Sequence, residues 1–275
     1  MRRDTRRTRA DLLANVVVTK PTSVKLPIGS APYDQLMYVD PDTRRSVRRP
    51  IRPDELGAVA FESFPPIRRF PAYKGKRSHE GSYWFSGTGS HVRFESHFES
   101  IALMLLDFSQ QVQRVSSNPF WLLWPKGLTP ARHAPDFFAR THNGSVVLVD
   151  VHPAALISEQ IAEQHLRTRR VCEALGWSYH EFTAVEPVVQ HNVSLLAGYS
   201  RPRSAPPPAI ATIIRSHVPT PSAGGITVAD LLDAAHDATG LSHHSISTAV
   251  YHMLWRRQLH TNLQRPLTSD AKVWR

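Results

Sequence analysis

A helical pattern of apolar positions runs from residue 94 to residue 108. Large apolar side chains recur there every three to four residues, which places them on one face of a helix: Phe94, Phe98, Ile101, Leu105 and Phe108. Glu95 and Glu99 are four residues apart and share a second face. The pattern therefore predicts an amphipathic helix whose second face is acidic.

The pattern after this helix is typical of strands. Residues 111–124 are dense in aromatic and β-branched side chains, which favour strands. Two further strand-like runs, 137–140 and 145–151, flank His142-Asn143-Gly144, and an Asn-Gly pair between such runs is a strong hairpin signal. The continuous apolar run in the second of them predicts a central strand that is covered on both faces.

A second helix is predicted between Ser158, a favoured N-cap residue, and Gly176, a favoured C-terminal residue. Residues 177–182 follow as a strand. The order of helix, strand, hairpin, helix and strand predicts an α/β fold in which one helix covers each side of a mixed sheet.

Two segments lack such a pattern. Residues 1–60 hold clusters of arginine that prolines interrupt, which predicts a basic, partly disordered arm. Residues 187–225 are rich in proline, which predicts a linker. Residues 61–186 between them form the predicted main domain, in which the aromatic and basic stretch 61–93 precedes the core at 94–186.

The last segment, residues 226–275, predicts a compact winged-helix-like unit. Thr227 caps one helix, a second helix starts at Ser245, and two short strands follow around 261–263 and 272–274. The outer face of the second helix would carry polar side chains: Ser245, Ser247, Thr248, Tyr251, His252, Arg256 and Arg257. Winged helices bind either DNA or other proteins, and the sequence leaves both open.

Charge indicates a class of partner only through its placement along the chain. The net charge is +10, and residues 1–80 hold 17 Lys and Arg against 9 Asp and Glu, a surplus of 8. Such a segment suits a polyanion, of which nucleic acid is the commonest, or is a solvated arm with no dedicated partner.

Composition excludes several other classes of protein. A single cysteine, Cys172, precludes an intramolecular disulfide and a Cys-rich zinc site, and it fits a reducing cytoplasm. Apolar runs are much shorter than the ~20 residues that span a bilayer. The sequence has no Gly-rich phosphate loop and no GxSxG motif. We therefore expect a cytoplasmic, nucleoid-associated protein with no membrane partner.

Three acidic positions and one histidine occur in an order that suggests phosphodiester chemistry. Glu99 lies on the first helix, Asp136 follows Pro135, and Asp150 precedes His152 by two residues at the end of the central strand. Converging carboxylates hold Mg²⁺ or Mn²⁺, and the ion positions water and offsets charge on a phosphate. The order resembles the PD-(D/E)xK nuclease layout, with His152 in place of lysine. Each position alone is also explained by a solvated acid or a turn.

The sequence resembles the TnsA-like endonuclease subunits of heteromeric transposases, notably actinobacterial members. The resemblance spans about residues 67–200, and it rests on an ordered set of short stretches: Ile67-Arg68-Arg69-Phe70, Gly81-Ser82-Tyr83-Trp84, His91-Val92-Arg93-Phe94-Glu95-Ser96, Leu103-Met104-Leu105-Leu106-Asp107-Phe108, Asn118-Pro119-Phe120-Trp121-Leu122, His133-Ala134-Pro135-Asp136-Phe137-Phe138, Val149-Asp150-Val151-His152-Pro153 and Leu175-Gly176-Trp177.

The resemblance implies a restriction-endonuclease-like core that nicks double-stranded DNA at transposon ends with Mg²⁺ or Mn²⁺. Its partners would be an integrase-type transposase subunit and an AAA+ ATPase regulator. By position, Glu99, rather than Glu95, matches the family's helix acid, Asp136 its Pro-Asp acid and Asp150 its second strand acid. His152 stands where the family has lysine, and Asp150 stands where Glu or Gln is usual.

The DNA contacts predicted from basic and aromatic residues form two groups. They are Arg68, Arg69, Lys74, Lys76 and Arg77 before the core, and Tyr251, Arg256 and Arg257 in the C-terminal unit. Two alternatives to a transposase endonuclease remain open. One is an adaptor with an impaired nuclease site, and the other is a stand-alone restriction or defence nuclease.

Overall fold

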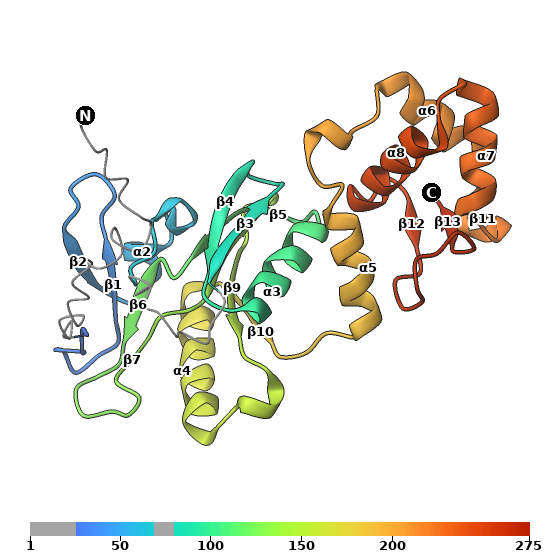
Figure 1. Ribbon diagram of the computed structural model, residues 1–275. Helices are drawn as coiled ribbons and strands as arrows, with labels where there is room; N and C mark the ends of the chain where they lie inside the picture. The colour runs from blue at the N-terminus through green and yellow to red at the C-terminus, as the bar shows by residue number, and fades with distance from the viewer. Residues whose placement is uncertain (1–25, 69–79) are drawn as a thin grey trace, which may run out of the picture.

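A computed structural model describes residues 26–68 and 80–275 of the chain (Figure 1). Within these residues, the architecture is mixed α/β, with seven α-helices and four sheets. This agrees with the α/β class expected from the sequence. No helix in the described part is long and apolar enough to cross a membrane.

The central sheet has the strand order β10-β9-β8-β5. Its strands are β5 (Val112–Ser117), β8 (Phe137–Thr141), β9 (Val146–Val151) and β10 (Ser178–Phe182). The predicted hairpin is confirmed, because β8 and β9 pair antiparallel on either side of the Asn-Gly turn. Strand β10 runs parallel to β9, so the sheet is mixed.

Two helices cover opposite faces of this sheet, as expected. Helix α3 (His97–Phe108) packs on Phe137, Ala139, Val149 and Val151, whereas α4 (Glu159–Leu175) packs on Phe138, Val146 and Leu148. The side chains of a strand alternate between faces, so odd-numbered positions of β9 face α3 and even-numbered positions face α4. The short 3-10 helix η2 (Ala154–Leu156) leads from β9 into α4.

Residues 26–60 form regular structure instead of the arm predicted over 1–60. Strands β1 (Gln35–Val39) and β2 (Ser46–Pro50) join β6 (Phe120–Leu123) and β7 (Arg132–His133) in an antiparallel sheet of order β2-β1-β6-β7. Leu36 and Tyr38 are buried on one face of β1. The helices α2 (Pro53–Leu56) and η1 (Phe61–Ser63) follow. The basic residues before position 26 lie outside the described residues.

The strand material predicted over 111–124 belongs to two sheets. Strand β5 ends at Ser117 and pairs with β8, whereas β6 begins at Phe120 and pairs with β1. Asn118 between them has a φ of 42°, in the left-handed region that asparagine tolerates better than most residues. This corner turns one continuous segment from the central sheet into the second sheet.

A hairpin of β3 (Gly81–Phe85) and β4 (Ser90–Phe94) precedes α3. The helix predicted from residue 94 therefore begins three residues later, because Phe94 still belongs to the strand. The buried carboxylate of Asp107 on α3 fixes the turn of this hairpin. It accepts hydrogen bonds from the backbone N–H groups of Ser86 (2.8 Å) and Gly87 (3.2 Å).

The predicted linker over 187–225 contains two helices, α5 (Pro187–Ala197) and α6 (Pro208–His217), with short 3-10 segments η3 (Pro202–Ser204) and η4 (Pro221–Ala223). Proline is tolerated in the first turn of a helix, because the N–H it lacks has no partner there. Both helices have proline in that position. These prolines therefore begin helices instead of preventing them.

The C-terminal unit contains α7 (Val228–Thr239), α8 (His243–Trp255) and a sheet of order β11-β13-β12. Its strands are β11 (Ile226–Thr227), β12 (His260–Thr261) and β13 (Lys272–Trp274). The N-cap at Thr227 is confirmed, and α8 begins at His243, two residues before the predicted start. His252 is buried, against the prediction of an outer face, because its Nδ1 lies 2.7 Å from the Tyr199 carbonyl oxygen.

This unit shares a hydrophobic core with α3. Ile101, Met104 and Phe108 of α3 lie in one buried cluster with residues of α5 to α8, and Figure 1 shows α5 between α3 and the C-terminal helices. The rings of Phe108 and Trp255 are 5.4 Å apart. Helix α3 therefore contributes to two cores, one under the central sheet and one under the C-terminal unit.

Candidate functional site

Asp136 lies at the junction of the two sheets, between β7 and the start of β8. Its side chain is half-buried, and Oδ2 accepts a hydrogen bond from the Val151 N–H at 2.8 Å. Its carbonyl oxygen accepts from the Asn118 N–H at 2.9 Å. Burial, together with the charges of Asp150 and Glu99, raises the pKa of Asp136 well above its usual value.

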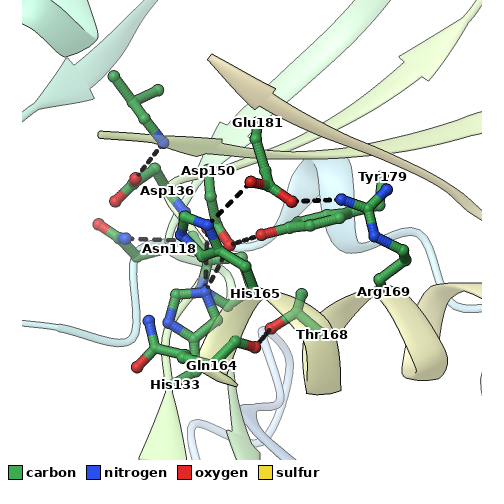
Figure 2. A network of polar contacts seen from close by, with 12 residues as sticks. Asn118, His133, Asp136, Asp150, Gln164, His165, Thr168, Arg169, Tyr179 and Glu181 are labelled. Carbon is green, nitrogen blue, oxygen red and sulfur yellow. Dashed lines mark hydrogen bonds and ion pairs between the residues drawn. The ribbon is translucent and has the colours of Figure 1, made fainter. Parts of the chain in front are cut away.

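Asp150 is buried on the α4 side of β9, and its carboxylate is fully engaged (Figure 2). His133 Nε2 lies 2.8 and 3.0 Å from its two oxygens, and the Tyr179 hydroxyl donates to Oδ2 at 2.6 Å. The Asp136 N–H also donates to Oδ1 at 3.3 Å. Burial opposes ionisation, but the charge and hydrogen bond of His133 outweigh it, so the pKa of Asp150 is lowered.

Glu99 forms an arrangement similar to a capping box at the start of α3, in which its carboxylate reaches the N–H of Glu95, one residue before the N-cap Ser96. The Ser96 hydroxyl accepts from the Glu99 N–H at 3.1 Å, and Glu99 Oε2 accepts from the Glu95 N–H at 2.7 Å. The Ser96 hydroxyl lies 3.1 Å from the other oxygen, Oε1. Both oxygens therefore stabilise the helix start. Burial raises the pKa of Glu99, and the nearby charge of Glu95 adds to this effect.

Glu95 lies just before the cap of α3 and pairs with Arg68. The guanidinium Nη2 of Arg68 is 3.3 Å from Glu95 Oε2. The second oxygen, Oε1, is buried and has no hydrogen-bond partner among the described residues. Arg68 also lies over the ring of Trp121, 5.9 Å from its centre. This pair therefore leaves one carboxylate oxygen without a donor.

His152 lies beyond the end of β9, half-buried beside α4. Its ring centre is 6.3 Å from that of His165, which is buried on α4. Burial and the proximity of His165 lower the pKa of His152. The side chain at the position where the resembled family has lysine is therefore mainly uncharged at neutral pH.

A second polar group lies beside Asp150 on the α4 side. His165 Nδ1 is 3.1 Å from Glu181 Oε2, and Arg169 pairs with the other oxygen of Glu181 (Figure 2). The Thr168 hydroxyl donates back to the Gln164 carbonyl oxygen within α4. This group links α4 to β10. Its side chains cover Asp150 on the α4 side.

The four predicted site residues are thus brought together only in part. The charges of Asp150 and Glu99 both act on Asp136, so the three acids lie in one neighbourhood, and the charge of Arg68 reaches Asp136 and Glu99. His152 lies on the α4 side with His165, where the charge of Asp150 also acts on it. In the described residues, no three His, Cys, Asp or Glu side chains are arranged as ligands of one metal ion.

The acids nevertheless suit a hard divalent cation that keeps some of its water. Mg²⁺ is commonly bound through one or two carboxylates, with water and substrate phosphate supplying the remaining ligands. Burial and the charges of Asp150 and Glu99 destabilise Asp136 as an anion. A cation beside Asp136 would offset this cost.

The predicted DNA contacts are placed apart from one another. Arg68 is described and lies beside the acids, whereas Arg69, Lys74, Lys76 and Arg77 lie outside the described residues. Arg256 is exposed at the end of α8. Tyr251 packs against Tyr199 at 5.1 Å between ring centres, and Arg257 lies over Phe108 at 5.1 Å. Tyr251 and Arg257 therefore also contribute to packing.

A surface cleft of about 310 Å³ lies elsewhere, between the end of β2 and α4. It contains none of the predicted site residues. Its lining includes Tyr33, Asp34, Pro50, Ile51, Arg52 and Arg170. The predicted site residues therefore lie away from this cleft.

Two residues of the site were missed by the sequence analysis. His133 and Tyr179 fix Asp150, and each is far from it along the chain. His133 lies three residues before Asp136 in the same stretch, which is a usable signal for a histidine near the acids. Tyr179 gives no such signal, because it approaches Asp150 only through the pairing of β10 with β9.

Comparison of the chain with protein-family models gives no match, and comparison with curated proteins gives none either. The similarity to TnsA-like subunits therefore stays a prediction from the sequence.

Proposed function

We propose that the protein is a Mg²⁺-dependent DNA endonuclease subunit of a heteromeric transposase. The observation that carries the proposal is the set of interacting carboxylates at Asp136, to which Glu99, Asp150 and the guanidinium of Arg68 all contribute charge. Like charges that raise a pKa by proximity are frequent at catalytic centres. The mixed sheet with a helix on each face supports a restriction-endonuclease-like core.

Each part of the site has a role in this proposal. Asp136, with Asp150 and an acid from the start of α3, holds the cation, and Arg68 faces the negative charge of the DNA backbone. A bound Mg²⁺ supplies charge stabilisation at the phosphate and a more acidic water molecule. His133 and Tyr179 fix the Asp150 carboxylate, so that its charge is held in place.

The C-terminal unit supports a winged-helix role next to the core. The order α6, β11, α7, α8, β12 and β13 supports a winged-helix fold, in which the helix in the place of α8 would enter the major groove of DNA. His243, His244 and Ser245 at the start of α8 are exposed. In the proposed complex, this unit binds DNA or the neighbouring transposase subunit, and an AAA+ ATPase regulates the assembly.

A strand-specific nicking assay at transposon ends tests the proposal. Wild-type protein, with Mg²⁺ and its partner transposase, is expected to nick, and Asp136→Ala is expected to lose at least about a hundredfold of the rate, as for removal of one charge-stabilising group. An Asp136→Ala protein that nicks at the wild-type rate contradicts the proposal. Nicking without any partner favours the stand-alone restriction or defence nuclease.

A second candidate is a DNA- or protein-binding adaptor that retains the fold and has lost the reaction. It is favoured by Asp150, whose oxygens are engaged by His133 and Tyr179, and by His152, which is mainly uncharged. His152→Lys separates the two candidates. A gain of nicking with this variant indicates an impaired site, whereas wild-type nicking that the variant leaves unchanged or lowers indicates a site that works without lysine.

A further inference from the structure

Three segments of the chain contain no aspartate or glutamate. They are the β3–β4 hairpin at 81–94, the segment 187–229 with α5 and α6, and the segment 238–269 with α8. Residues 81–275 as a whole have a net charge of only +2, so these segments are basic within a nearly neutral region. Their seven basic residues are all arginines: Arg93, Arg201, Arg203, Arg215, Arg256, Arg257 and Arg265.

The three segments meet beside α3. The Trp255 indole N–H at the end of α8 donates to the Ser86 hydroxyl in the hairpin turn at 3.4 Å, and η3 lies against α8. At the start of η3, the guanidinium of Arg201 lies over the ring of Trp84 on β3, 5.3 Å from its centre. A positive charge from the second segment is thus held against an aromatic ring of the hairpin.

Strand pairing places Trp84 on the outer face of the hairpin. Trp84 is opposite His91, and their rings are 5.2 Å apart. The neighbouring pair, Tyr83 and Val92, faces the other way and packs in the cluster that contains Leu103 of α3. His91 is exposed. The outer face therefore carries a tryptophan and a histidine, with Arg201 stacked on the tryptophan.

This face has donors that lack acceptors. Arg201 and Arg203 are exposed, and within the described part of the chain neither pairs with a carboxylate. The indole N–H of Trp84 is buried and also has no acceptor among the described residues. Stacking on the indole orients the guanidinium plane of Arg201, whose N–H groups can then bind two oxygens of one anion. The face therefore complements a partner that presents acceptors and negative charge.

The polarity of this face favours DNA over an acidic protein. The centres of protein–protein interfaces are apolar and depleted in charge, whereas protein–DNA interfaces are more polar and strongly positive. Among the described residues, β3, β4 and η3 expose no large apolar side chain. Ser82 and Ser90 are exposed on the hairpin, and serine hydroxyls are common donors to phosphate.

We propose that Trp84 and His91 of the hairpin, with Arg201 and Arg203 of the η3 segment, form a surface that binds the phosphate backbone of double-stranded DNA. This rests on the proposed action on DNA. Arg201 and Arg203 contact the phosphates, and Trp84 is a positioning residue that holds the Arg201 guanidinium. Because the hairpin packs on α3 and η3 packs on α8, a duplex bound here contacts both the core and the C-terminal unit.

The salt dependence of DNA binding by the full chain tests this surface. Fluorescence anisotropy of a labelled duplex measures the affinity at several KCl concentrations, and log K falls with log salt by about 0.9 for each phosphate that is neutralised. Arg201→Gln and Arg203→Gln are each expected to weaken binding and to reduce this slope by about 1. Arg170→Gln is the matched control, because Arg170 is exposed on α4, on the opposite face of the central sheet.

A double-mutant cycle tests the position of Trp84. Trp84→Ala is expected to weaken DNA binding when Arg201 is present and to have no further effect in Arg201→Gln. Equal losses in both backgrounds overturn the positioning role. Thermal unfolding of each variant shows whether it is folded, and the two exposed arginine variants test the surface independently of Trp84.

The outcomes distinguish this inference from the proposed endonuclease function. A wild-type slope in both arginine variants, or an equal reduction in Arg170→Gln, overturns the surface, even if the protein nicks DNA. Polyglutamate that competes better than unlabelled duplex indicates an acidic protein partner and also overturns it. A wild-type protein that binds DNA through these arginines and does not nick overturns the endonuclease function alone.

Discussion

Asp136 and Asp150 are neighbours with opposite environments. The Asp136 N–H donates to Asp150, whose side chain is buried, whereas the side chain of Asp136 is half-buried. Asp150 has His133 and Tyr179 as donors, and its pKa is lowered. Asp136 accepts one backbone hydrogen bond beside two other acids, and its pKa is raised. Asp150 is therefore stable as an anion in the folded protein, whereas ionisation of Asp136 costs free energy.

The raised pKa of Asp136 predicts how the stability of the metal-free protein changes with pH. Above about pH 4 the unfolded state loses the Asp136 proton, while the folded state retains it until its raised pKa is reached. Stability therefore falls over that window as pH rises. Asp136→Asn is expected to raise the free energy of unfolding by about 1.4 kcal/mol or more at pH 8, the value of one pKa unit, and by less at pH 5.

Urea unfolding in EDTA at the two pH values measures this gain. Asp237→Asn is the matched control, because Asp237 is exposed on α7, and its substitution is expected to leave stability unchanged within about 0.5 kcal/mol. A gain for Asp136→Asn that is equal at pH 5 and pH 8 contradicts the argument. Added Mg²⁺ is expected to stabilise the wild type more than Asp136→Asn.

At the scale of elements, the corner at Asn118 holds the site together. Its N–H donates to the Asp136 carbonyl oxygen at 2.9 Å, and its side-chain Nδ2 donates to the Pro135 carbonyl oxygen at 3.0 Å. Its own carbonyl oxygen accepts from the Ile67 N–H at 2.8 Å. The segments that carry Asp136 and Arg68 are thus joined through one residue between β5 and β6.

Substitutions at Asn118 separate its two contributions. Asn118→Gly keeps the left-handed backbone and loses the side-chain bond to Pro135, which is expected to cost about 1 to 2 kcal/mol. Asn118→Ala loses the same bond and adds strain at a φ of 42°, so it is expected to cost about 1 kcal/mol more. Chemical denaturation measures both, and an alanine variant as stable as the glycine variant contradicts the role of the backbone.

The helices and strands also show which parts of the fold the sequence pattern could predict. The hairpin at Asn143-Gly144 and the caps at Ser158 and Gly176 were predictable, because each depends on residues adjacent in the chain. The helices at Pro187 and Pro208 were not, because the same proline that begins a helix also interrupts one. The partners of Asp150 were hidden for another reason, since strand pairing and not sequence spacing brings them together.

At the scale of the whole molecule, α3 joins the central sheet to the C-terminal unit. Trp255 of α8 is fully buried against Phe108, and its indole N–H donates to the Ser86 hydroxyl at 3.4 Å. Ser86 is also held by Asp107. A change in this core therefore acts on the helix whose first turn carries the acids of the site.

We expect the full chain to unfold in a single calorimetric transition because of this shared core. Trp255→Ala is expected to lower the free energy of unfolding by about 3 to 5 kcal/mol, as for other large buried aromatic side chains, and to shift the whole transition. Leu241→Ala, an exposed residue between α7 and α8, is the control with little effect. A separate low-temperature transition of the C-terminal unit in Trp255→Ala would contradict this coupling.

The corner at Asn118 also has a consequence for how such a chain tolerates change over evolutionary time. The segments that carry Asp136 and Arg68 are both hydrogen-bonded to Asn118. The loop between β6 and β7 and the turn between β8 and β9 lie outside this set of hydrogen bonds. Insertions and deletions in surface connections cost little free energy. Those two connections are therefore free to diversify in length while the spacing of Asp136 and Arg68 is inherited intact.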